Sequence, residues 1–134
     1  MPAPQVSVVL PTRNRSAMLR KSLRSALDQD GMGLEVIVID DGSSDDTAEQ
    51  LARIDDQRLT VRRNDPPQGV ARARNAAIER ARGEWIAFLD DDDLWAPGYL
   101  RAQLATAADQ GLSLCYSGRI EIDERGMFGF LSGS

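Results

Sequence analysis

The chain has 134 residues and a formal net charge of −5, from 16 basic and 21 acidic side chains. This length predicts one domain over residues 1–134 with a real core, and the acidic balance argues against a nucleic-acid partner. The single cysteine excludes an intramolecular disulfide, and the lack of histidine excludes a histidine-based zinc site or catalytic triad.

The sequence predicts no transmembrane segment, because it contains no apolar stretch of 18 residues. Its N-terminus also lacks the charged-then-apolar pattern of a secretion signal. We therefore expect a cytoplasmic location, with a peripheral position at the inner face of a membrane as the alternative.

The first half of the chain alternates short apolar runs with amphipathic segments. Residues 6–10 and 34–39 are almost continuously apolar, which predicts buried strands. The strands predicted in this half are residues 6–10, 34–39 and 59–61. A first helix is predicted to begin at Ser16, which would cap it, and to end at about Gln29. A second helix is predicted to be capped by Asp45 or Asp46.

The second half repeats the alternation. A helix is predicted over residues 70–81, ended by Gly83, and a strand over 84–89. The remaining predicted elements are a helix from Pro97 to Gly111, strands at 112–117 and 119–123, a turn at 124–126, and a strand at 127–131 that pairs back as a hairpin.

Alternating strands and helices predict an α/β fold, a mostly parallel sheet with helices on both faces. In such sheets ligands bind outside the carboxyl ends of the strands. Three polar segments follow predicted strands at corresponding positions: residues 11–15, residues 40–41 and residues 90–93. Their repetition predicts a binding site at this edge of the sheet.

Four consecutive carboxylates, Asp90 to Asp93, follow directly on an apolar run. Like charges at a strand end repel each other, so a divalent cation with a preference for oxygen is the expected partner. The alternative is a solvated acidic loop that caps the following helix. Residues 35–56 carry eight acids and one base, whereas residues 58–82 carry seven arginines and two acids. An acidic region beside a basic one suits a site for a metal and an anionic ligand together.

The sequence lacks the residues that several other classes of binding site or enzyme require. Neither G-x-G-x-x-G nor G-x-x-x-x-G-K-[ST] follows the first strand. An EF-hand from Asp90 would need glycine and glutamate where Trp95 and Arg101 stand. A phosphoacceptor receiver domain would need a late lysine, but Lys21 lies in the first helix. A glycosidase needs separated acid and base groups, and this acidic cluster is contiguous.

Four motifs resemble those of the family 2 glycosyltransferases, which have the GT-A fold. They lie at residues 6–15 (VSVVLPTRNR), 36–46 (VIVIDDGSSDD), 69–78 (GVARARNAAI) and 83–93 (GEWIAFLDDDD), in the family's order and spacing. Together they extend over nearly the whole chain. Arg13 departs from the pattern, because the family often has an aromatic residue at this position.

The resemblance implies a nucleotide-diphospho-sugar donor, a UDP-sugar above all, and Mg²⁺ or Mn²⁺ as cofactor. It places Pro11, Thr12 and Asp41 near the nucleobase and Asp91 towards the ribose. The nucleotide-sugar-binding residues that it implies are Pro11, Thr12, Arg15, Asp40, Asp41, Gly69, Arg74, Asp90 and Asp91, and the metal ligands are Asp92 and Asp90.

Two of these residues also have a structural interpretation. Asp41 could instead cap the turn that follows it, and Arg74 could pair only with Asp65 or with one of the strand-end acids.

The resemblance further implies inverting transfer of the sugar to an acceptor hydroxyl. Family members continue into a second half that binds a saccharide, lipid or protein acceptor and supplies an acidic general base. We therefore expect the general base beyond residue 134, so that this chain binds the donor and transfers sugar poorly or not at all. We also expect uncovered apolar sheet surface, which favours a homodimer or marginal stability. The alternatives are a non-catalytic nucleotide-sugar-binding module and a plain α/β interaction domain.

Overall fold

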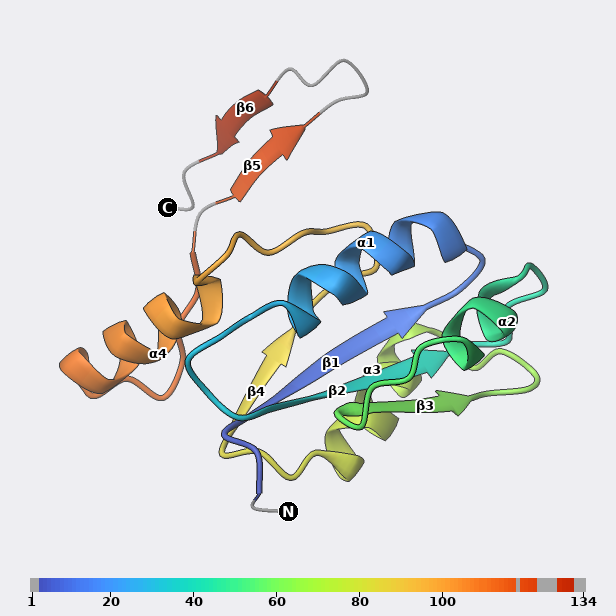
Figure 1. Cartoon of the computed structure of the whole chain (residues 1–134), viewed down its shortest axis with the longest axis horizontal. Coiled ribbons are helices and arrows are strands. Elements are labelled where there is room, and N and C mark those ends of the chain that lie inside the picture. Colours follow the sequence, from blue (N-terminus) through green and yellow to red (C-terminus); the bar gives the residue numbers. More distant parts are fainter. Residues whose placement is uncertain (1–2, 118, 123–127, 132–134) are drawn as a thin grey trace. The chain divides into compact units, whose positions relative to one another are not determined.

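The computed structural model describes residues 3–117, 119–122 and 128–131, and their side chains as far as residue 117. The chain divides into two compact units, residues 1–98 and residues 99–134 (Figure 1). The sequence-based expectation of one domain over residues 1–134 stays a prediction.

A parallel four-stranded sheet forms the centre of the first unit. Its strands are β1 (Val6–Thr12), β2 (Leu34–Asp40), β3 (Leu59–Arg63) and β4 (Trp85–Phe88), in the order β3-β2-β1-β4. The two central strands, β1 and β2, are buried along their whole length. The predicted parallel α/β architecture is therefore confirmed.

The register of the strands decides which loops meet. Thr12, the last residue of β1, pairs with Asp40, the last residue of β2, and Asp40 in turn pairs with Arg63 at the end of β3. Phe88, the last residue of β4, pairs with Val9. The loops that follow the strands consequently leave from the same edge of the sheet, where the sequence predicts the site.

Helices lie on both faces of this sheet, as predicted. Figure 1 shows α1 (Ser16–Leu27) on one face and α3 (Val70–Arg80) on the other. Val9, Ile37 and Ile39 form one buried cluster with two alanines of α3. Because successive strand residues point to opposite faces, the alternate buried residues of β1 and β2, which are Val6, Val8, Leu10, Leu34, Val36 and Val38, face the α1 side. The two alanines are Ala73 and Ala77, whose small side chains let the helix approach the strands closely.

The start of α1 differs from the prediction, whereas the second helix begins at its predicted aspartates. Ser16 is not a cap: Arg15 occupies the N-cap position of α1 without a side-chain bond, and the N–H of Ser16 donates to Asp45 Oδ2 over 3.3 Å. The aspartate of a neighbouring turn thus satisfies this donor. The short helix α2 (Thr47–Ala52) begins after Asp46, and Asp45 accepts the N–H of Thr47.

The second unit contains α4 (Tyr99–Gln110) and an antiparallel hairpin of β5 (Arg119–Ile122) and β6 (Phe128–Leu131). The helix begins at Tyr99 and not at Pro97, because Gly98 between them has a left-handed backbone with φ of 78°. Both hairpin strands are confirmed over the residues that the structure describes. The predicted turn at 124–126 lies outside the described residues.

The strand predicted at residues 112–117 is wrong. Its alternating apolar residues, Leu112, Leu114 and Tyr116, are exposed and belong to no strand. Alternation marks a strand only where a neighbouring strand accepts its backbone hydrogen bonds, and the described chain pairs none with this segment. None of the described helices is long and apolar enough to cross a membrane.

The edge strand β4 carries two exposed apolar side chains, Ile86 and Phe88. They lie two residues apart and therefore point to the same face of the sheet. This exposure agrees with the expected uncovered apolar surface, whereas the homodimer stays a prediction.

A buried polar network closes the opposite, amino-terminal end of the sheet. The Ser7 hydroxyl donates to Glu35 Oε1 over 2.6 Å, and the backbone N–H of Arg82 donates to the same oxygen over 2.8 Å. The Arg82 guanidinium donates to Glu35 Oε2 over 3.1 and 3.2 Å. Glu35 therefore ties β1 and β2 to the segment that leads into β4.

Gly83 belongs to the same junction. Its N–H donates to Ser7 Oγ over 2.8 Å, and a Cβ atom at this position would lie 2.6 Å from the backbone nitrogen of Ser7. Only glycine permits this close approach. Gly83, which the sequence indicated as the end of a helix, is therefore also needed for β4 to pair with β1.

We predict that Glu35→Gln lowers the free energy of unfolding at pH 7 by about 1.5–3 kcal/mol, because a charged hydrogen-bonded group is lost. Burial alone would raise the pKa of Glu35, but the bonds from Ser7 and Arg82 hold this pKa below its ordinary value of 4.5. The carboxylate's contribution is then complete above pH 4.5 and is lost as the pH falls through the lower folded-state pKa.

Urea unfolding across the acid range measures this effect. The difference between wild type and Glu35→Gln should shrink below pH 4.5. Glu79→Gln, which changes an exposed carboxylate of α3, is the matched control. A variant as stable as the control at pH 7 would show that the network contributes nothing.

Candidate functional site

A cavity of about 460 Å³ opens at the carboxyl edge of the sheet. The loops after β1, β2, β3 and β4 and the first turns of α3 all contribute to its wall. Every predicted nucleotide-sugar-binding residue except Asp40 lines it. The lining residues are Pro11, Thr12, Arg13, Arg15, Asp41, Gly69, Val70, Ala73, Arg74, Asp90, Asp91 and Asp92.

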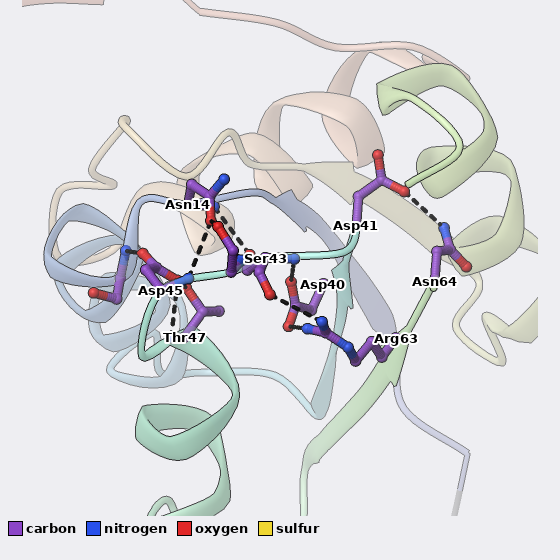
Figure 2. Close-up of polar contacts among 10 residues, drawn as sticks. Asn14, Asp40, Asp41, Ser43, Asp45, Thr47, Arg63 and Asn64 are labelled. Atoms are coloured by element: carbon purple, nitrogen blue, oxygen red, sulfur yellow. Dashed lines mark hydrogen bonds and ion pairs between the residues drawn. The ribbon is translucent and has the colours of Figure 1, made fainter. Parts of the chain in front are cut away.

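Asp40 lies outside the cavity wall and is engaged in the fold. Its side chain accepts the N–H of Ser43 over 3.0 Å and forms an ion pair with Arg63 at 2.7 Å. Arg63 also donates to the Ser43 carbonyl over 2.9 Å. Figure 2 shows the Asp40 carboxylate directed to Arg63 and the turn, away from Asp41. This buried residue fixes the turn after β2 to the end of β3.

Asp41 is also buried, but its carboxylate organises a different loop. It accepts hydrogen bonds from Asn64 Nδ2 over 3.1 Å, from the Gln68 N–H over 2.8 Å and from the Gly69 N–H over 2.9 Å. The loop from β3 to α3 is thus held against the end of β2. The structural alternative for Asp41 is wrong, because the carboxylate that bonds the turn at 42–43 is that of Asp40.

The bonds of Asp41 keep it ionised. Burial alone would raise the pKa of this carboxyl, but the donors from Gln68, Asn64 and Gly69, helped by the positive charge of Arg13, hold the pKa below its ordinary value. A carboxylate has about four acceptor positions, and three are used here. One acceptor position remains for a ligand.

Two glycines shape the wall around Asp41. Gly69 has a φ of 95° and directly precedes α3, so its N–H points to Asp41. Gly42 has a φ of 69°, and a Cβ atom there would lie 2.5 Å from the Pro67 side chain. The loops after β2 and β3 therefore pack so closely that only glycine fits between them.

Asn14 fixes the loop after β1, which carries Arg13 and Arg15 of the cavity wall. It has a left-handed backbone with φ of 52°, which asparagine tolerates. Its Oδ1 accepts the N–H groups of Ser44 over 2.7 Å and Asp45 over 3.3 Å, and its own N–H donates to Ser43 Oγ over 2.9 Å (Figure 2). The sequence analysis missed this role, which an asparagine in a strand-end loop could have suggested.

The acids after β4 form ion pairs with two of the cavity's arginines. Asp91 is buried and accepts the Thr12 hydroxyl over 2.9 Å and Arg15 Nη1 over 3.1 Å. The same Arg15 nitrogen lies 3.3 Å from Asp92 Oδ2. Arg74 Nη2 lies 2.7 Å from Asp90 Oδ1, so the pairing of Arg74 with a strand-end acid is observed.

Arg13 differs from these two arginines. It lines the cavity and lies near enough to Asp41 to lower that pKa. Among the described residues it has no carboxylate within ion-pair distance, whereas Arg15 and Arg74 are both paired. Its charge is therefore available to a ligand.

Three of the four strand-end acids could hold a metal ion. Asp90, Asp92 and Asp93 are exposed, and each offers a carboxylate oxygen within 4.8 Å of the others. Exposed carboxylate oxygens are the donors that Mg²⁺ and Mn²⁺ prefer, so these residues fit such an ion. Asp93 was not among the predicted ligands, because it lies outside the D-x-D spacing. The backbone N–H of Asp93 donates to the Asp90 carbonyl over 3.1 Å, and this turn places Asp93 close to the other two acids.

Solved structures of glycosyltransferases of the GT-A fold match this chain. One is the TarS 1–349 fragment from S. aureus in complex with UDP-GlcNAc, with a TM-score of 0.74, 29% identity, and coverage of 80% of this chain and 32% of that one. Another is the mannosyltransferase PcManGT from Pyrobaculum calidifontis in complex with GDP-Man and Mn²⁺. Its TM-score is 0.69 at 30% identity, over 88% of this chain and 35% of that one.

A curated relative is the Escherichia coli UDP-Glc:alpha-D-GlcNAc-diphosphoundecaprenol beta-1,3-glucosyltransferase WfgD. It is 36% identical over 117 residues, which are 87% of this chain and 46% of the relative. The chain thus spans about half the length of this relative.

The family model described as Glycosyl transferase family 2 matches residues 7–131, which include all four sequence motifs except Val6, and every residue that lines the cavity. On this match and on the fold, the chain belongs to glycosyl transferase family 2.

Proposed function

We propose that this chain binds the nucleotide-diphospho-sugar donor, a UDP-sugar, of a metal-dependent glycosyltransferase that transfers the sugar to an acceptor hydroxyl with inversion. One observation carries the proposal. Asp41, the arginines and the exposed acids after β4 line a single cavity. Its volume of about 460 Å³ falls in the range usual for small-molecule sites.

The charges along the cavity suit such a donor. Asp90 and Asp92 lie at the end of β4, Arg74 and Arg15 lie beside them, and Asp41 lies at the end of β2. A diphosphate needs positive charge, whereas a nucleobase offers ring N–H groups to an acceptor. We assign the diphosphate to the side of the acids and arginines, and the base to Asp41.

In this assignment Asp92 and Asp90 hold Mg²⁺ or Mn²⁺. The metal, when bound, neutralises charge that develops on the diphosphate leaving group. The similar structures, one in complex with UDP-GlcNAc and one with GDP-Man and Mn²⁺, support this donor class and this type of ion.

None of the four carboxylates that line the cavity is assigned as the general base. Asp41 and Asp91 are buried and hydrogen-bonded within the fold, while Asp90 and Asp92 are assigned to the metal. An acceptor hydroxyl needs a base within hydrogen-bond reach. This division of roles favours donor binding as the task of the described residues.

The acceptor and the location are further parts of the proposal. The name of the Escherichia coli relative includes a diphosphoundecaprenol-linked sugar as the group that receives glucose. A lipid-linked saccharide is therefore the acceptor that we propose for the whole enzyme. Such an acceptor would place the protein in the cytoplasm at the inner face of the membrane.

We predict that UDP binds this chain in the presence of Mn²⁺ more tightly than GDP, CDP or dTDP do. Isothermal titration with the four diphosphates measures the preference. Acceptor-dependent release of nucleoside diphosphate would separate a transferase from a binding module. A chain that binds none of the four with Mn²⁺ would overturn the proposed donor class and favour an interaction domain.

We predict that Asp92→Ala weakens UDP binding in Mn²⁺ at least roughly tenfold, about 1.4 kcal/mol, because a ligand of the metal is lost. The loss should disappear when a chelator removes the metal from both proteins. Asp55→Ala, which removes an exposed carboxylate outside the cavity, is the control. Equal affinity of wild type for UDP with and without chelator would contradict the metal assignment.

We predict that Asp41→Asn weakens the binding of UDP and of uridine by about 1.5–3 kcal/mol, the contribution of a charged hydrogen bond. Binding of inorganic pyrophosphate with Mn²⁺ should stay nearly unchanged, because pyrophosphate has no base to contact Asp41. Calorimetry with the three ligands measures the difference.

The control for this variant is Asn64→Ala, which removes one bond to the same loop and keeps the carboxylate. It should weaken uridine binding less than Asp41→Asn does. Parallel losses of UDP and pyrophosphate in Asp41→Asn would show that Asp41 acts through the loop and not through the base.

A further inference from the structure

Among the acids after β4, the two assigned to the metal are also the two that carry exposed ion pairs. Arg74 Nη2 lies 2.7 Å from Asp90 Oδ1, and Arg15 Nη1 lies 3.3 Å from Asp92 Oδ2. A carboxylate oxygen in an ion pair with a guanidinium offers fewer lone pairs to a cation. A metal ion and these arginines therefore compete for the same oxygens.

The pair of Arg74 and Asp90 is easily broken. Its side chains are 38% and 49% exposed, and exposed pairs of this kind contribute little to stability. The pair of Arg63 and Asp40 in the same sheet edge contrasts with it, because the Asp40 side chain is only 2% exposed. The fold thus depends on Arg63 and leaves Arg74 free to change partner.

Arg15 is held more firmly than Arg74. The same nitrogen that approaches Asp92 also contacts Asp91, whose side chain is only 9% exposed and is bonded to Thr12. Arg15 can leave Asp92 and still keep Asp91. Arg74 has Asp90 as its one carboxylate partner among the described residues.

Resting on the proposed function, we propose that Arg74 holds Asp90 while the metal is absent and exchanges it for the donor diphosphate when the metal binds. A divalent ion on Asp90 repels the guanidinium and takes up its acceptor oxygen. Arg74 lines the cavity, so the diphosphate that arrives with the metal is the nearest anion. The planar guanidinium can donate two parallel bonds to phosphate oxygens.

The exchange links metal and donor through one side chain. Metal binding releases Arg74 for the diphosphate, and diphosphate binding draws Arg74 from Asp90 and frees that acid for the metal. By thermodynamic linkage, each ligand then strengthens the binding of the other. Asp90 also keeps a counter-charge whenever the metal is absent.

The test is the sign of two affinity changes in Arg74→Gln. Binding of Mn²⁺ alone should become roughly two- to fivefold tighter, because a competitor for Asp90 is removed. Binding of UDP in saturating Mn²⁺ should become at least roughly tenfold weaker, because a charged bond to phosphate is lost. Uridine, which has no phosphate, should bind the variant as it binds wild type.

Two variants with the same change of charge serve as controls. Arg72→Gln changes an arginine that lies two residues before Arg74 on α3 and outside the cavity. Arg13→Gln changes an arginine that lines the cavity but forms no ion pair with Asp90. Neither should tighten Mn²⁺ binding as Arg74→Gln does. Unfolding curves should show all three variants to be as stable as wild type, within about 0.5 kcal/mol, because these side chains are at the surface.

Weaker or unchanged Mn²⁺ binding by Arg74→Gln would overturn the exchange. So would an equal tightening in Arg13→Gln, because any positive charge in the cavity would then have the same effect. In either case the donor assignment would stand as long as wild type binds UDP with Mn²⁺. If wild type binds neither Mn²⁺ nor UDP, both the exchange and the proposed function are wrong.

Discussion

Repulsion among carboxylates at one edge of the sheet is the constraint to which this structure responds. The parallel register brings the ends of β1, β2 and β4 together, and with them Asp40, Asp41 and the acids after β4. Each buried acid has a dedicated partner. Asp40 pairs with Arg63, Asp41 accepts backbone and amide N–H groups, and Asp91 accepts Thr12 and Arg15. Without these donors, the buried charges could not be accommodated.

Burial divides the acids into two groups with different tasks. The buried ones connect loops: Asp40 the turn after β2, Asp41 the loop into α3, and Asp91 the ends of β1 and β4. The exposed ones, Asp90 and Asp92, have only surface ion pairs and remain accessible to a cation. The cavity is therefore rigid where its loops are joined and adjustable where a metal and a diphosphate would bind.

At the opposite end of the sheet a buried acid also has dedicated hydrogen-bond donors, but there it serves the fold alone. Glu35 is buried there, and Ser7, the Arg82 backbone and the Arg82 guanidinium all donate to it. Ser7, Glu35 and Arg82 do not line the cavity described above. A saturated acid of this kind stabilises the sheet, whereas the incompletely saturated Asp41 leaves one acceptor position open.

The sequence by itself determined the parallel α/β fold, the edge of the sheet where the cavity opens, and most residues of the cavity wall, all except Arg13, Val70 and Ala73. Those features depend on local patterns, since apolar runs make strands and strand ends in a parallel sheet share an edge. Which of two adjacent aspartates faces the cavity was decided only by the tertiary structure. Asp40 and Asp41 are identical in the sequence, but adjacent residues point to opposite sides, and Arg63 arrives on one side while the loop at 64–69 arrives on the other. The same holds for residues 112–117, which have no partner strand in the described part of the chain, and for Arg74, for which the sequence left both Asp65 and the strand-end acids open as partners.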